Sequence, residues 1–168
     1  MRKALSLLCV AALGAALVAA CGYSTGLRVA ERHRSVGVQF FGNDSYERDL
    51  ERPLDDELTR ALRNFVDVPI VDVSRAEVLV RGKILRYVHR SGIRTRDNVP
   101  LETGAGIEVE AVLVERATDK VLRGPVRAMS SVGYLIEVPG AEAEARDRAL
   151  RHVAEELVLD LFAPESGP

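Results

Sequence analysis

Hydrophobic positions along this chain repeat at two periods, of which one predicts strands and the other predicts helices. Between residues 35 and 41 apolar side chains alternate, with Val36 and Phe40 on one face, which predicts a strand. The next segment carries leucines at spacings of three and four, which predicts an amphipathic helix over about residues 52–64. Pro53 suits the first turn of that helix, because a proline there removes no helical hydrogen bond.

The middle of the chain predicts further strands, and its end predicts a second helix. Strands are expected over 70–73, 76–90, 107–114 and 121–135. Gly82 indicates a bulge or a close backbone approach, and Pro125 indicates a sheet edge or a bulge, because proline cannot donate to a ladder. A polar loop is expected over 91–104, and a helix with one apolar stripe over 141–162.

This order of elements predicts an α+β fold, in which a mixed, mostly antiparallel sheet of about four strands carries two helices packed on one face. Each predicted helix has a single apolar stripe, so it can bury only one side. The strand–helix–strand beginning implies one parallel pair of strands joined by a right-handed crossover. The side chains expected in the core are Leu58, Leu62, Val153, Leu157 and Leu161.

The N-terminus has the pattern of an export signal. Arg2 and Lys3 precede an uncharged run over residues 4–20, and its 17 residues fall short of the roughly 20 that a membrane-spanning helix needs. The run ends in Val18-Ala19-Ala20-Cys21, which resembles the bacterial lipobox. The Cys21 thiol would then carry a diacylglyceryl group, and fatty acids such as palmitate would anchor the protein. The alternative is an ordinary signal peptide that happens to end near a cysteine.

The expected organisation is a single domain behind a lipid anchor. Removal of the signal leaves 148 residues, the size of one ordinary domain. The residue after the cysteine is Gly22, whereas an aspartate at this position retains enterobacterial lipoproteins at the inner membrane. The absence of that aspartate favours the outer membrane, with the domain facing the periplasm. We expect a signal peptide at 1–20, a lipidated tether at 21–34, a single α/β domain at 35–162 and a tail at 163–168.

Charge and motifs argue against nucleic-acid binding and against catalysis. The signal holds two of the 23 basic residues and none of the 25 acidic ones, so the rest of the chain carries a net charge of −4. Nucleic-acid binders usually show a basic excess. His33, His89 and His152 have no metal-ligand spacing, and neither a phosphate loop nor a nucleophile elbow is present. We therefore expect no enzyme activity, no cofactor and no metal.

Basic residues gather in one strand and the loop after it. Arg81 and Lys83 share a strand face by the two-residue period, and Arg94 and Arg96 follow in the polar loop. These four side chains are candidates for binding the phosphates of a lipid. The alternative is a solvated strand face of mixed charge.

Taken in order, several segments resemble the LptE family of lipopolysaccharide-assembly lipoproteins. The matching segments are Cys21-Gly22-Tyr23, Val36–Asn43, the helix end Leu58-Thr59-Arg60-Ala61-Leu62, Ala76–Ile84, the hairpin Val112–Leu122 and Ala143–Leu150. Together they run through nearly all of the chain after the signal.

The resemblance implies a fold, a location and a partner. The fold is a four-stranded sheet with two helices, and the location is the outer membrane. The partner is the large β-barrel LptD. The lipoprotein would plug the lumen of this barrel, assist its assembly and help pass lipopolysaccharide to the outer leaflet. Arg81, Lys83, Arg94 and Arg96 would then be candidate contacts for lipopolysaccharide phosphates, although no motif marks the family's own contact residues here.

Other small envelope lipoproteins share the same beginning. Activators of penicillin-binding proteins and the curli-secretion lipoproteins also start with a strand that ends in Phe-x-Asn, followed by a helix and a strand. A third alternative is an auxiliary lipoprotein of an ABC lipid transporter, which would need an apolar cavity. The co-purifying partner separates these possibilities: a large barrel, a peptidoglycan synthase or a transporter.

Overall fold

Two helices and five strands make up the part of the chain that the computed structural model describes, which is residues 27, 33–92, 96 and 102–163. In chain order the elements are β1 (Val36–Val38), β2 (Gly42–Asn43), α2 (Glu51–Phe65), β3 (Val78–Ser91), β4 (Glu102–Glu115), β5 (Lys120–Leu135) and α3 (Ala141–Phe162). Helix α3 has the bounds that its apolar stripe predicts, and α2 is one residue longer than predicted at each end.

The strands form one mixed sheet in the order β1-β3-β4-β5, with the two-residue β2 also paired to β3. β1 and β2 run parallel to β3, whereas β3–β4 and β4–β5 are antiparallel. The predicted mixed, mostly antiparallel sheet is therefore confirmed, as is the parallel pairing of the first strand with β3, and β2 adds a second parallel pair. β2 is the strand that the pattern missed, because two residues are too short to show a period.

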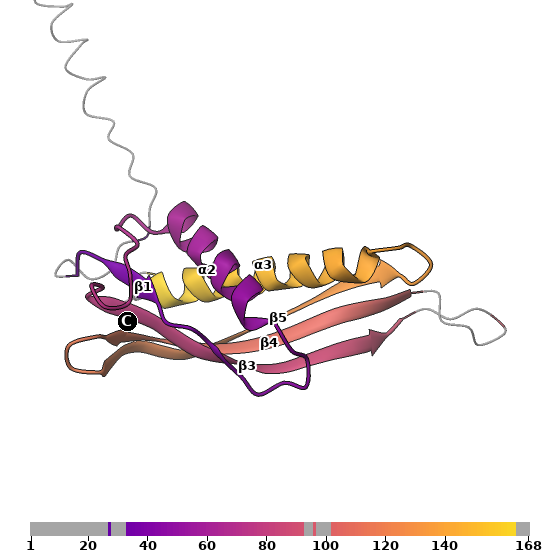
Figure 1. Ribbon diagram of the computed structural model, residues 1–168, viewed down its shortest axis with the longest axis horizontal. Coiled ribbons are helices and arrows are strands. Elements are labelled where there is room, and N and C mark those ends of the chain that lie inside the picture. The colour runs from indigo at the N-terminus through magenta and orange to yellow at the C-terminus, as the bar shows by residue number, and fades with distance from the viewer. Residues whose placement is uncertain (1–26, 28–32, 93–95, 97–101, 164–168) are drawn as a thin grey trace, which may run out of the picture.

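Both helices lie on the same side of the sheet (Figure 1), and one hydrophobic core joins them to it. α3 runs along β4 and β5, and α2 packs against α3 and β1. The sheet contributes alternate residues, such as Val80 and Val109, to this core. The five predicted core residues are all confirmed as buried, with at most 1% of each exposed: Leu58, Leu62, Val153, Leu157 and Leu161.

The first predicted strand is wrong in its second half. β1 ends at Val38, Phe40 is 66% exposed, and Phe41 is buried in its place. Val38 pairs with Val80 while Gly42 pairs with Lys83, so four steps on one strand match three on the other. This extra residue reverses the alternation of faces, which a sequence period cannot anticipate.

Two connecting segments also differ from prediction. The expected strand at 70–73 is reduced to one isolated bridge between Ile70 and Val36. The expected loop at 91–104 is shorter, because β4 begins at Glu102. Gly104 and its neighbours look like loop residues in the sequence, yet pairing with both adjacent strands holds them in the ladder. Pro125 does lie in an edge strand beside a register shift, as predicted.

The segment before β1 contacts the domain at several of its described residues. Leu27 forms a bridge with Val66, its N–H donating to the Phe65 carbonyl at 2.7 Å. His33 is buried, and its Nε2 lies 3.3 Å from Glu115 Oε1. Both residues belong to the predicted tether at 21–34, and so does Arg34, whose N–H donates to Glu77 Oε2 at 2.7 Å. The remaining tether residues lie outside the described part of the chain. Within the described residues no helix is both long and apolar enough to cross a membrane.

Candidate docking face of the sheet

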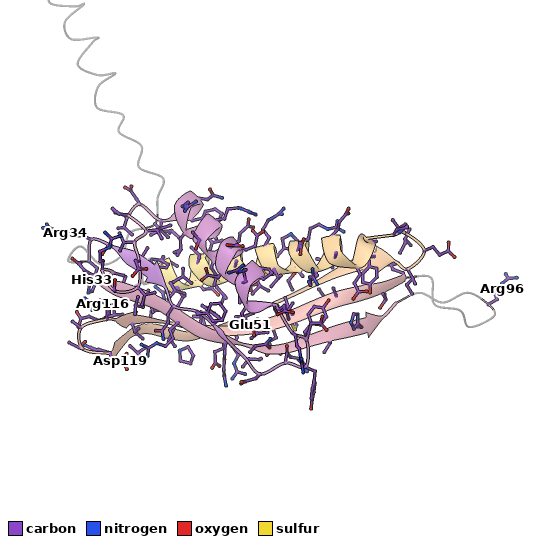
Figure 2. All side chains as sticks on the ribbon, viewed as in Figure 1. His33, Arg34, Glu51, Arg96, Arg116 and Asp119 are labelled. Atoms are coloured by element: carbon purple, nitrogen blue, oxygen red, sulfur yellow. The ribbon has the colours of Figure 1, made fainter. Side chains whose placement is uncertain are left out.

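The side of the sheet that the helices leave uncovered carries charged side chains in cross-strand rows. Val80, Val109 and Ala128 point into the core, so their sequence neighbours point the other way. We call this surface the open face, and its side chains project on the side of the sheet away from the helices (Figure 2). It comprises Arg81, Lys83, Arg86, Glu108, Glu110, Arg127 and Met129.

Charges on the open face alternate in sign from strand to strand. Lys83, Glu110 and Arg127 lie side by side in register, and Asp44 extends the row beyond Lys83. The Lys83 Nζ–Asp44 Oδ2 distance is 2.7 Å, and Arg127 Nε donates to Glu110 Oε2 at 2.7 Å. The hydrogen bond to Asp44 raises the pKa of Lys83, as that to Glu110 raises the pKa of Arg127. Each cation therefore already has a carboxylate partner.

A second row and an arginine near the start of β3 repeat this arrangement. Arg86 Nη2 donates to Glu108 Oε2 at 2.8 Å. Arg81 donates from Nε to Gln39 Oε1 and from Nη2 to Asp119 Oδ1, both at 2.8 Å. Most of the open face is thus polar, with charges that are balanced within the chain. At the start of β3 the same side of the sheet also carries a small apolar cluster of Ala76, Leu79 and Val114, and Met129 is exposed further along.

The predicted phosphate contacts do not form one cluster. Arg81 and Lys83 do lie on the same face, with 38% and 47% of their side chains exposed. Arg81 precedes the end of β3 by ten residues, which in a strand is about 33 Å. Arg96 is exposed beyond that end, at the tip of the molecule (Figure 2). Arg94 lies outside the described residues, as does the proposed lipid attachment site Cys21.

The structure adds acidic residues that the sequence analysis did not connect with the basic ones. Asp44 and Asp119 come from turns, and Glu108 and Glu110 come from β4. In the sequence, the alternation of Glu108 and Glu110 with apolar residues indicates a strand with one exposed face. The sequence could not predict which residues of β3 they pair with, because the register between β3 and β4 shifts between Ile84 and Arg86.

The three histidines lie apart from one another, each beside a different partner. His33 faces Glu115, His89 Nε2 lies 3.7 Å from Glu142 Oε1, and His152 Nδ1 lies 3.4 Å from Ser130 Oγ. Within the described residues, no three His, Cys, Asp or Glu side chains are arranged to hold a metal ion.

Comparison with known proteins relates the fold to solved structures. No protein-family model and no curated protein matches the sequence. The PelC dodecamer from Paraburkholderia phytofirmans is similar at a TM-score of 0.52 and 16% identity, over 83% of this chain and 96% of that one. Protein XCC0632 from Xanthomonas campestris is similar at 0.54 and 15%, over 80% and 85%. Hypothetical protein CT253 from Chlamydia trachomatis is similar at 0.52 and 9%, over 79% and 99%. At such low identity these likenesses show a shared fold alone.

Proposed function

We propose that this chain is a lipid-anchored, non-catalytic binding protein of the bacterial outer membrane, which partners an LptD-type β-barrel and assists lipopolysaccharide assembly. The observation that carries the proposal is the open face, a sheet surface of internally paired charges. The lumen of a large barrel is polar and contains water. A surface that brings its own counter-charges can enter such surroundings without burying an unpaired charge, which would be costly.

The order of elements supports the choice of this partner among the alternatives. The resemblance to the LptE family implies a sheet of four strands with two helices, and the strand path β1-β3-β4-β5 with both helices is compatible with it. Antiparallel sheets commonly leave one face in water, so the open face alone does not select a partner. The resemblance through nearly all of the chain after the signal, together with the lipobox pattern at Cys21, supports this choice of partner.

The other envelope roles remain alternatives with distinct partners. A lipid carrier of an ABC transporter needs an apolar cavity, whereas the hollow of about 500 Å³ at the end of the sheet is lined partly by Glu102, Glu142 and His89. A peptidoglycan-synthase activator or a curli-secretion-like adaptor would share the fold. Self-association is a further outcome to watch, because one protein of similar fold is a dodecamer.

Co-purification from detergent-solubilised outer membranes tests the proposal. The tagged full chain, expressed at its native level, should retain a large β-barrel, and its depletion should lower surface lipopolysaccharide and the amount of assembled barrel. Retention of a peptidoglycan synthase, a transporter or only further copies of this chain would contradict the barrel assignment. Unchanged surface lipopolysaccharide after depletion would do the same.

A pair of charge reversals tests the open face itself. Glu110→Arg places a third cation between Lys83 and Arg127 and should reduce retention of the barrel. Glu156→Arg makes the same change of charge on the exposed side of α3 and should leave retention unchanged. Circular dichroism and thermal melting would establish that both variants fold. Equal retention by the two variants would mean that the open face is not the docking surface.

A further inference from the structure

A hollow of about 500 Å³ lies where β3 stops, β4 begins and β5 turns into α3. We call it the end pocket. In Figure 1 this is the end of the sheet with the β5–α3 turn, opposite the end where β1 lies. The side chains that matter here are His89, Glu102, Tyr134, Ile136, Val138 and Glu142.

One side of the end pocket is acidic. The Glu142 carboxylate is near enough to the Tyr134 hydroxyl to raise its pKa, and His89 Nε2 lies 3.7 Å from Glu142 Oε1. Glu102 reaches over the backbone of Gly133, since a Cβ on that glycine would lie 2.7 Å from Glu102 Oε1. Burial is the main cause of the raised pKa of Tyr134, and the charge of Glu142 adds to it. Two carboxylates therefore border the same hollow.

The other side is apolar and exposed. Ile136 and Val138 are 46% and 50% exposed, and Pro139 continues the wall. The turn that carries them is held by hydrogen bonds, because Val138 N–H donates to the Leu135 carbonyl and Ala141 N–H to the Val138 carbonyl. Exposed apolar groups beside well-placed polar ones are typical of sites that bind a ligand.

We propose that the end pocket binds an arginine side chain of a partner polypeptide. The guanidinium would lie between Glu102 and Glu142, where its planar fork can donate to both carboxylates. Its methylene groups would lie on Ile136 and Val138, as long basic side chains cover apolar surface elsewhere. The volume accommodates such a side chain together with adjoining backbone.

No described arginine or lysine of the chain lines the end pocket. Among the described side chains that line the end pocket, His89 is the one that can carry a positive charge. Arg146 lies one turn further along α3 and contacts Asp147 at 3.6 Å. Arg96 lies at the tip of the molecule, beyond the end of the sheet (Figure 2). Among the described side chains, charge complementarity therefore favours a guanidinium group at the end pocket.

A peptide titration tests the proposal. The purified full chain in detergent micelles, labelled with nitrogen-15, is titrated with acetyl-Leu-Arg-Leu-amide and followed by amide chemical shifts. The expected result is saturable change at pocket residues such as Thr103 and Gly140. The same peptide with citrulline in place of arginine keeps the shape but lacks the charge, and should cause no saturable change.

Matched variants locate the effect. Glu102→Gln and Glu142→Gln should each weaken binding about tenfold, because each removes one charge-assisted hydrogen bond. Glu137→Gln makes the same charge change at an exposed residue outside the lining and should bind as the parent does.

Several results would overturn the pocket assignment. They are equal binding of the citrulline peptide, equal weakening by Glu137→Gln, shifts that map to the open face, and shifts on dilution that reveal a second copy as the occupant. The assay contains neither barrel nor lipopolysaccharide, so its failure would leave the proposed function standing, and the reverse also holds.

Discussion

The ring of Phe41 lies across the backbone of Gly82. A Cβ built on Gly82 would stand 2.5 Å from Phe41 Cε1 and 2.1 Å from the Glu110 carbonyl oxygen. Phe41 is 1% exposed, so this contact closes the core at the edge where β2 joins β3. The close approach that the sequence indicated at Gly82 is confirmed, and the side chain that makes it comes from the bulge between β1 and β2.

Gly82→Ala should therefore destabilise the protein. The added methyl group meets backbone as well as the ring, and overpacking of this kind costs about 1–3 kcal/mol. Gly42→Ala is the matched control, because its Cβ would meet only Lys83 Cβ at 3.6 Å, an ordinary contact. Urea unfolding of the two variants measures the difference. Equal free energies of unfolding would contradict the packing of Phe41 on Gly82.

Two leucines two positions apart on α3 should respond very differently to truncation. Leu157→Ala removes a fully buried side chain and should cost about 2–5 kcal/mol. Leu159→Ala removes one that is 43% exposed and should change stability by less than about 0.5 kcal/mol. Chemical denaturation checks both values. Similar losses would contradict the packing of α3 on the sheet.

The carboxylates on the open face should limit anion binding. Asp44→Asn with Asp119→Asn frees Lys83 and Arg81, and should strengthen binding to purified lipopolysaccharide by about two- to fivefold, the range of exposed ion pairs. Arg81→Gln with Lys83→Gln should weaken that binding. Measurements at physiological salt decide the matter. If neither pair of substitutions changes the affinity, the two cations are not phosphate contacts.

Lipid attachment should depend on one of the two cysteines. Cys21→Ser should abolish incorporation of labelled palmitate, because the thiol is the proposed attachment atom. Cys9→Ser lies within the predicted signal and should leave incorporation intact. Labelling that survives Cys21→Ser would refute the anchor.

Stability should fall at high pH through Tyr87. Burial, then Glu142 and Glu47, raise the pKa of Tyr87 from 10.0 to about 12. In this pH range the unfolded chain releases the proton first, so the stability that Tyr87 contributes is complete below pH 10 and is lost as pH rises towards 12. Urea unfolding over this range measures the loss, and Tyr87→Phe should make it smaller. An unchanged pH dependence in that variant would exclude Tyr87 as the cause.

Much of the local structure was predictable because it depends on near neighbours. The leucine stripes place α2 and α3 within a residue of their ends, since a period of 3.6 shows over several turns. Gly82 and Pro125 were informative because each lacks something that a regular strand needs, a side chain in one and an N–H in the other. The prediction for the first strand was wrong at Phe40, because one extra residue there reverses which side chains face the core.

The sequence by itself determined the elements, the apolar faces and the candidate anchor at Cys21, because these patterns are written in consecutive residues. Only the tertiary structure decided which charges meet. Lys83 lies beside Glu110 and Asp44, and Glu102 and Glu142 border one hollow, because strand register and bulges bring distant segments together. No local period encodes that register, so the open face and the end pocket became visible only in the folded chain.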